Sequence, residues 1–380
     1  MRQLLDALLD RPLYLALPAL ALVLAALTVP LYRLARKPAP GTTDWMRGID
    51  PPRFSGYRIF ALRWTDLLFC AAAGLLAAAL CLAAEALRTG AALGLPWLRD
   101  SLYLLGSTAL MGVLIYLPTR MMWGSPLAAL CVAALSGLQG FGAEATSFLA
   151  LALFFLNDWL TADGQQPLLF HAFWLVPTAL AYGLSLLMAP ELLWFLPLLV
   201  LAYALAQCYR WRTGLEKQRG GKLAVSIVLT LLLVLLTSAT VTMLRLMLDG
   251  LDPEDFWTTK FVIALPGEML RAFLRGFRLG ALPTPTLFDV VVLILALAGW
   301  LTAAHGLVRK RETVCLTAVL LPLPVLALWL CGTENALHLL FPALLPFGRV
   351  WAGLARKRKF AAPALFAAGI AVCLIFAMTF

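Results

Sequence analysis

Charged residues are scarce in this chain, and their scarcity excludes a soluble domain of any size. Only 13% of the 380 residues are charged and 62% are hydrophobic, whereas a water-soluble domain normally carries about a quarter charged residues. The apolar stretches run repeatedly to about 18 residues and beyond, close to the roughly 20 that cross the hydrocarbon core of a bilayer as a helix. The composition therefore predicts an integral membrane protein that crosses a bilayer many times.

Strict alternation of apolar and polar residues is also missing, which excludes a closed barrel of short transmembrane strands. The stretch Leu223–Leu236, for example, shows no alternation. Helices remain, because a span must satisfy every backbone N–H and C=O group without water. We predict an all-α fold, a polytopic transmembrane helical bundle of about twelve spans. The spans, of which the fourth is short enough to be re-entrant, are Pro12–Leu34, Trp64–Leu87, Ser101–Pro118, Ser125–Leu138, Ala145–Leu160, Pro167–Met188, Glu191–Cys208, Leu223–Met247, Pro285–Leu307, Thr313–Cys331, Ala336–Leu354 and Ala361–Phe380.

Metal-binding and nucleotide-binding motifs are absent from the sequence. Its seven cysteines and three histidines are dispersed, with no C-x-x-C pair and no Cys–His cluster, so neither a zinc site nor a disulfide framework is predicted. There is no G-x-x-x-x-G-K-[ST] loop and no G-x-G-x-x-G turn. These absences leave ATP hydrolysis and dinucleotide chemistry without support.

Positive charge is unevenly distributed between the loops. With alternating spans, 20 of the 30 Lys and Arg residues fall on one face, which is the cytoplasmic face by the positive-inside rule. This face includes Arg63, Arg120 and the clusters Arg210–Lys222 and Arg356–Lys359, whereas Arg349 lies within a span. We therefore predict a multi-pass protein of the cell membrane with both termini extracytoplasmic. The net charge of +10 is then mainly a topology signal, and no nucleic-acid partner is expected.

The predicted outer loops are mostly short and acidic, so their charged groups lie close to the membrane surface. Asp100 precedes the third span, and Glu144 follows the turn at 140–142. Glu334 and Asn335 cap the eleventh span, with His338 one turn into it. An ionisable group at membrane depth is costly and indicates function. The alternative is that each carboxylate only solvates a turn or caps a helix N-terminus.

The longest outer segment, 247–285, contains a predicted in-plane amphipathic helix. At 100° per residue, Arg271, Arg275 and Arg278 fall on one narrow arc, and the apolar side chains of 269–277 fall on the opposite arc. The helix is too short and too charged to span the bilayer. Three guanidinium groups on one face suit a phosphate or pyrophosphate, because each can donate a bidentate pair of hydrogen bonds. The alternative is a helix on the outer leaflet whose arginines contact lipid head groups.

Four segments carry a resemblance to a known family. Leu117–Gly124 looks like a short basic turn, Ala143–Leu153 looks like an E-A-R-x-x-x-L-L-L-A-L segment, and His338–Pro346 is similar to an R-Y-L-L-P-x-x-P segment. Lys260–Leu279 looks like a long extracytoplasmic loop. Together they resemble the GT-C superfamily, polytopic glycosyltransferases that use polyprenyl-phosphate-linked sugars such as dolichyl-phosphate mannose or arabinose donors.

The resemblance covers roughly residues 60–380. It implies a GT-C-like transmembrane domain over 64–380, preceded by an N-terminal span and a basic cytoplasmic loop over 1–63. Two departures bear on the catalytic site. The first outer loop, Arg88–Asp100, is short and has Asp100 as its sole carboxylate, and Thr146 replaces the arginine of the E-A-R segment. The site is therefore reduced to Asp100 and Glu144, or the chain is a relative that has lost catalysis.

If catalysis survives, the resemblance implies sugar transfer from a polyprenyl-phosphate donor to a glycan or lipid acceptor on the extracytoplasmic face of the membrane. Asp100 or Glu144 would be the catalytic base, and positive charge would stabilise the leaving phosphate. The residues expected to bind substrate are Arg271, Arg275, Arg278, Glu334 and His338. The sequence indicates no particular cofactor; a divalent metal could bind at Asp100 and Glu144, although their spacing does not indicate one.

Two other classes of function stay open. A transporter or flippase for a lipid or small solute fits twelve spans equally well, but the span interiors hold few of the ionisable residues that ion-coupled carriers usually bury at mid-depth. A non-catalytic membrane relative fits the short first outer loop. A cavity open to the outside and to lipid would favour sugar transfer, whereas a polar tunnel along the bundle axis would favour transport.

Overall fold

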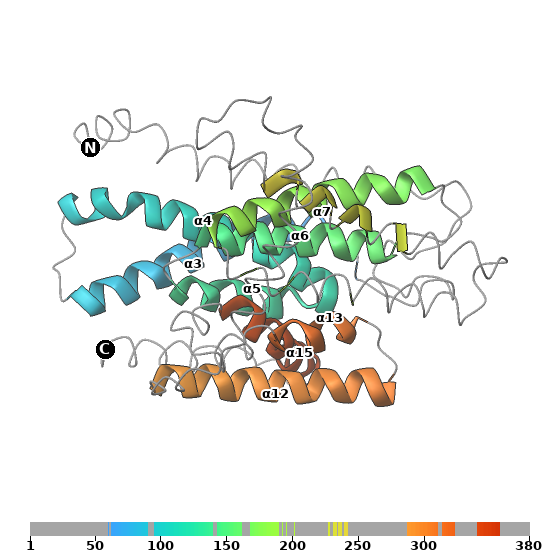
Figure 1. Cartoon of the computed structure of the whole chain (residues 1–380). Helices are drawn as coiled ribbons and strands as arrows, with labels where there is room; N and C mark the ends of the chain where they lie inside the picture. The colour runs from blue at the N-terminus through green and yellow to red at the C-terminus, as the bar shows by residue number, and fades with distance from the viewer. Residues whose placement is uncertain are drawn as a thin grey trace, which may run out of the picture.

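The structure, a computed structural model, describes residues 60, 62–89, 95–139, 143–161, 168–189, some positions between 192 and 241, 287–310, 314–323 and 340–357. Every regular element in these ranges is a helix and none is a strand (Figure 1). The elements are α3 (Asp66–Thr89), α4 (Leu95–Trp123), α5 (Pro126–Ser136), η2 (Gly137–Gln139), α6 (Ala143–Thr161), α7 (Leu168–Met188), α12 (Leu287–Lys310), α13 (Cys315–Leu320) and α15 (Leu340–Lys357). The predicted all-α class is confirmed for this part of the chain.

Two of these helices contain a segment that is long and apolar enough to cross a membrane, Asp66–Glu85 of α3 and Ser101–Trp123 of α4. Helices α5, α6, α7 and α12 contain shorter apolar stretches. The predicted first and last spans, Pro12–Leu34 and Ala361–Phe380, lie outside the described residues, as do both termini. The bundle of about twelve spans and its orientation therefore stay predictions.

Helix α3 places small side chains inside the protein and large apolar side chains outside. Cys70, Ala73 and Ala77 are fully buried, at spacings of three and four residues that put them on one face of a helix. Leu68 and Leu75 are 74% and 72% exposed. Lipid tails are as apolar as leucine, and small interface residues allow close helix packing in a membrane. The packing of α3 thus agrees with its predicted place in a bilayer.

Helices α3 and α4 form an antiparallel pair that depends on two glycines. A Cβ atom on Gly112 would lie 2.7 Å from the Ala73 carbonyl oxygen, and one on Gly74 would lie 3.0 Å from that of Ala109. The two backbones are therefore in direct contact at this level, as small residues permit at helix interfaces in membranes. This pairing places the start of α3 beside the end of α4, and the end of α3 beside the start of α4 (Figure 1).

Helix α5 is too short to cross a membrane. Its 11 residues extend about 16 Å at 1.5 Å per residue, which is about half of a hydrocarbon core. It starts at an N-cap, where the Ser125 hydroxyl accepts a hydrogen bond from the Ala128 N–H at 3.3 Å. It ends where Gly137 packs directly on the backbone of Ala77, halfway along α3. The predicted shortness of the fourth span is confirmed.

Helices α12 and α15 also pack through glycines. A Cβ atom on Gly299 would overlap the Phe347 backbone, and one on Gly306 would overlap the Arg349 guanidinium. Arg349 donates a hydrogen bond to the Thr302 carbonyl, which partly satisfies a cation predicted to lie within a span. Helix α15 packs in addition on α5 and α4, so the C-terminal helices and the α3–α5 segment form one bundle.

Candidate functional site

Two of the predicted site residues lie in the described part of the chain. Asp100 is near the start of α4, and Glu144 is in the first turn of α6. Because α4 packs against α6, the two residues belong to neighbouring helices, and a shared site for them stays a prediction. The predicted substrate-binding residues lie outside the described residues; they are Arg271, Arg275, Arg278, Glu334 and His338.

Glu144 is half-buried among buried neighbours. Ala143, Ala145 and Thr146 are at most 2% exposed. The Glu144 carboxylate makes no hydrogen bond or ion pair within the described residues. Glu144 lies in the first turn of α6, where a negatively charged side chain interacts favourably with the helix dipole. Glu144 is therefore a half-buried carboxylate that no described contact commits to the packing of the bundle.

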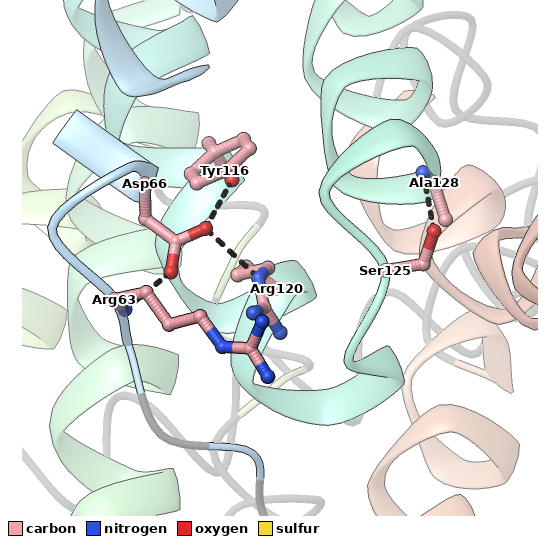
Figure 2. Close-up of polar contacts among 6 residues, drawn as sticks. All are labelled: Arg63, Asp66, Tyr116, Arg120, Ser125 and Ala128. Atoms are coloured by element: carbon pink, nitrogen blue, oxygen red, sulfur yellow. Dashed lines mark hydrogen bonds and ion pairs between the residues drawn. The ribbon is translucent and has the colours of Figure 1, made fainter. Parts of the chain in front are cut away.

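A second carboxylate, Asp66, is fully buried and fully engaged where α3 begins (Figure 2). Its Oδ1 atom accepts hydrogen bonds from the Tyr116 hydroxyl at 2.7 Å and from Arg120 Nε at 2.9 Å. Its Oδ2 atom accepts a hydrogen bond from the backbone N–H of Arg63 at 2.5 Å. The ion pair between Asp66 and Arg120 is thus removed from solvent, with side-chain exposures of 0% and 4%.

Local sequence explains how this cluster forms. Asp66 reaches back three residues to the N–H of Arg63, the interaction that an acidic residue makes in a capping box at the start of a helix. Tyr116 and Arg120 are four residues apart in α4 and so share one helix face. The antiparallel packing of α3 on α4 then brings this face to the first turn of α3.

The position of Arg120 corrects one prediction from sequence. Arg120 is predicted in a basic turn after a span ending at Pro118, yet α4 continues through Pro118 to Trp123, and Arg120 is buried. A proline removes only one helix hydrogen bond, and neighbouring helices in a membrane protein can satisfy the freed groups. The sequence did not reveal Asp66 as a functional candidate, although a carboxylate at the start of a predicted span is itself a signal.

The C-terminal end of α4 packs against α15. Trp123 Nε1 donates a hydrogen bond to the Leu345 carbonyl at 2.8 Å, and a Cβ atom on Gly348 would lie 2.9 Å from the indole ring. Gly124 has φ of +69° and lies against the Phe60 ring, so a side chain there is excluded on both counts. Two segments that carry the family resemblance, Leu117–Gly124 and His338–Pro346, therefore meet in space.

A metal site is not apparent within the described residues. They contain no group of three or more His, Cys, Asp or Glu side chains that could hold a metal ion. The buried cysteines, such as Cys70 and Cys131, have no disulfide partner among these residues and pack as small apolar side chains. A divalent metal at Asp100 and Glu144 stays untested.

Comparison with known proteins does not assign this chain to a family. No family model matches the chain, and no curated protein matches it. Two crystal structures of an oligosaccharyltransferase from Archaeoglobus fulgidus are similar in arrangement, the apo form at 14% identity and a TM-score of 0.38, and a form tethered to an acceptor peptide at 15% and 0.37. The alignments cover 96% and 98% of this chain but 55% of the enzyme. TM-scores this low do not decide the fold or the activity.

Proposed function

We propose that this chain is an integral membrane glycosyltransferase, which moves a sugar from a polyprenyl-phosphate donor to a glycan or lipid acceptor on the extracytoplasmic face. The observation that carries the proposal is Glu144, a half-buried carboxylate without a partner among the described residues. It opens α6, whose sequence resembles the E-A-R segment of the GT-C superfamily, and α6 packs on the helix that contains Asp100.

The proposed reaction needs only a base and positive charge. An acceptor hydroxyl attacks the anomeric carbon of the sugar, its proton passes to Glu144 or Asp100, and the bond to the phosphate oxygen breaks. The phosphate leaves with the bonding electrons, and a guanidinium group stabilises the negative charge that develops on it. Arg271, Arg275 and Arg278 are the residues that we propose for this role, with Glu334 and His338 binding substrate nearby.

The test is sugar transfer by the purified full-length chain from a radiolabelled polyprenyl-phosphate sugar. Glu144→Gln removes the base while keeping the shape of the side chain, so we expect transfer to fall by about 100-fold or more. Asp100→Asn tests the second carboxylate in the same way. Arg309→Gln, at an exposed arginine near the end of α12 on the predicted cytoplasmic face, is the control and should leave transfer unchanged.

Transport is the second candidate function, and the short length of α5 favours it. Helix α5 ends halfway along α3, and interrupted helices near the middle of the bilayer are common at the substrate sites of transporters. Movement of a fluorescent lipid across proteoliposome membranes distinguishes the two functions. Lipid movement that persists in Glu144→Gln, together with no sugar transfer by the unaltered protein, would replace the transferase proposal with this one.

A further inference from the structure

Helix α6 is enclosed on nearly every side. It packs on both α4 and α7, and Figure 1 shows it running alongside α7. Within 143–157 every residue is buried except Glu144, Phe148, Leu151 and Phe155, which are half-buried. Successive spacings of four, three and four residues put these side chains on one arc of about 60°. The described part of α6 therefore opens to its surroundings along a single line, which begins at Glu144.

The α6 stripe, which we define as Phe148, Leu151 and Phe155, differs from the faces that other helices turn outward. Leu75 of α3 and Leu301 of α12 are 72% and 61% exposed, whereas the stripe is half-buried. On a helix about 10 Å in diameter, an arc of 60° is about 5 Å wide. This width matches one hydrocarbon chain and is about half that of a second helix.

The length and polarity of the opening narrow its occupant further. Glu144 and Phe155 are 11 residues apart, which is about 16 Å along a helix and about half of a hydrocarbon core. An apolar chain of one leaflet spans this distance. Glu144, at the end that the sequence predicts to be the outer one, has no partner among the described residues. A molecule along the stripe therefore ends in a polar group at this carboxylate.

The chemistry of Glu144 selects the polar group. An ionised carboxylate only accepts hydrogen bonds, so it binds a hydroxyl group, and it repels a phosphate because the two charges have the same sign. A lipid with a single chain against the stripe and a hydroxyl group at its end satisfies both parts of the opening.

We infer that the sugar acceptor is a lipid, whose apolar chain lies along Phe148, Leu151 and Phe155 and whose hydroxyl group is held by Glu144. The inference rests on the proposed function and decides between a glycan and a lipid as acceptor. The lipid hydroxyl oxygen forms the new bond to the anomeric carbon, and its proton passes to Glu144. The bond from that carbon to the phosphate oxygen breaks, and its electrons leave with the phosphate of the donor.

The experiment is photo-crosslinking of the purified full-length chain in phosphatidylcholine proteoliposomes. Two probes carry the same photoactivatable alkyl chain, an alkylglycerol with an uncharged hydroxyl end and an alkyl phosphate with an anionic end. Mass spectrometry of peptides locates the labelled residues. Leu151→Trp fills the middle of the stripe. Leu297→Trp, the same change at a 44% exposed leucine of α12, is the matched control, and Glu144→Gln removes the charge at the end of the stripe.

We expect the alkylglycerol to label 148–155 strongly in the unaltered protein and in Leu297→Trp, and about tenfold less in Leu151→Trp. The alkyl phosphate should label α6 about tenfold less than the alkylglycerol, because like charges meet at Glu144. In Glu144→Gln the two probes should label α6 equally. Labelling of α6 no stronger than that of the exposed leucines of α12 would overturn the inference. Equal or stronger labelling by the alkyl phosphate in the unaltered protein would also overturn it, because the stripe would then accept a phosphate-ended lipid.

The lipid site and the transferase activity can fail separately. Labelling as expected, without sugar transfer to any acceptor, would keep the lipid site and remove the proposed function. Sugar transfer to a soluble glycan, without labelling of α6, would keep the function and remove the lipid acceptor. If Leu151→Trp does not fold, the comparison of the two probes in Glu144→Gln decides alone.

Discussion

Asp66 and Glu144 each lie in the first turn of a helix, and they are used in opposite ways. Asp66, at the start of α3, is fully buried and accepts hydrogen bonds from Arg63, Tyr116 and Arg120. Glu144, at the start of α6, is half-buried and has no partner among the described residues. A carboxylate in the first turn interacts favourably with the helix dipole in both cases. Helix position alone therefore does not distinguish a carboxylate that is fully hydrogen-bonded inside the bundle from one that has no described partner.

The difference lies in what the facing helix supplies. Opposite Asp66, α4 presents a tyrosine and an arginine four residues apart, so that the charge of Asp66 is compensated inside the bundle. Around Glu144, the buried neighbours of α6 are small residues such as Ala143 and Ala145. An unpaired carboxylate persists there because it is partly open to its surroundings. The comparison predicts that the two residues differ sharply in their effect on stability, and the variants below test it in order of expected effect.

Arg120→Ala should produce the largest loss of stability. Removing the arginine leaves Asp66 buried without its cation, and breaking one side of a buried ion pair costs about 3–5 kcal/mol. The free energy of unfolding, measured by SDS titration in mixed micelles, should fall by this amount. The double variant Asp66→Asn/Arg120→Gln removes both charges and should lose much less. If Arg120→Ala is as stable as the double variant, the ion pair does not hold the two helices together.

Gly137→Ala should have an intermediate effect. Gly137 packs on the backbone of Ala77, and an added Cβ atom would overlap it, so the end of α5 must shift at a cost of about 1–3 kcal/mol. Gly353→Ala in α15 is the control, because a Cβ atom there meets nothing within 4 Å. That substitution should stabilise the helix by up to about 1 kcal/mol. The same SDS titration measures both, and a loss of equal size in the two variants would contradict the close approach.

Trp123→Phe should have a smaller effect. The substitution removes the hydrogen bond from Nε1 to the Leu345 carbonyl, and a neutral hydrogen bond contributes about 1 kcal/mol. Trp64→Phe, at a tryptophan that is 58% exposed, should change stability by less than about 0.5 kcal/mol. Equal losses in the unfolding free energy of the two variants would show that the contact between α4 and α15 is not held by this bond.

The sequence predicts helices, apolar spans and the short α5 well, because these features follow from local composition. The burial of Cys70, Ala73 and Ala77 also follows from local sequence, because their spacing puts them on one face of α3. The partnership of Asp66 with Arg120 could not be predicted in this way. The two residues are 54 positions apart, and their contact depends on the angle and register at which α3 packs on α4.

The surroundings of Glu144 and Arg120 could be predicted only in part, for a related reason. The fifth span is predicted over Ala145–Leu160 with Glu144 in the turn before it, whereas α6 begins at Ala143 and contains Glu144 in its first turn. Pro118 was misleading because a proline usually ends a helix in water, whereas α4 continues past it. From sequence, Arg120 is therefore predicted to be a loop charge, whereas its burial depends on how the helices pack together.

Glu144→Gln should have the smallest effect on stability, and it tests the contrast between Glu144 and Asp66 most directly. Glutamine keeps the size of the side chain and removes only its charge, and no described interaction depends on that charge. The unfolding free energy should therefore stay within about 0.5 kcal/mol of the unaltered protein. Asp66→Asn, the same change at the other carboxylate, leaves the Arg120 cation buried and unpaired and should cost several times more. Catalytic residues are often suboptimal for stability, so under the proposed function Glu144→Gln can be slightly stabilising while it lowers sugar transfer by about 100-fold or more. A loss of several kcal/mol in Glu144→Gln would instead make Glu144 a structural carboxylate like Asp66, and its assignment as a catalytic base would lose its main support.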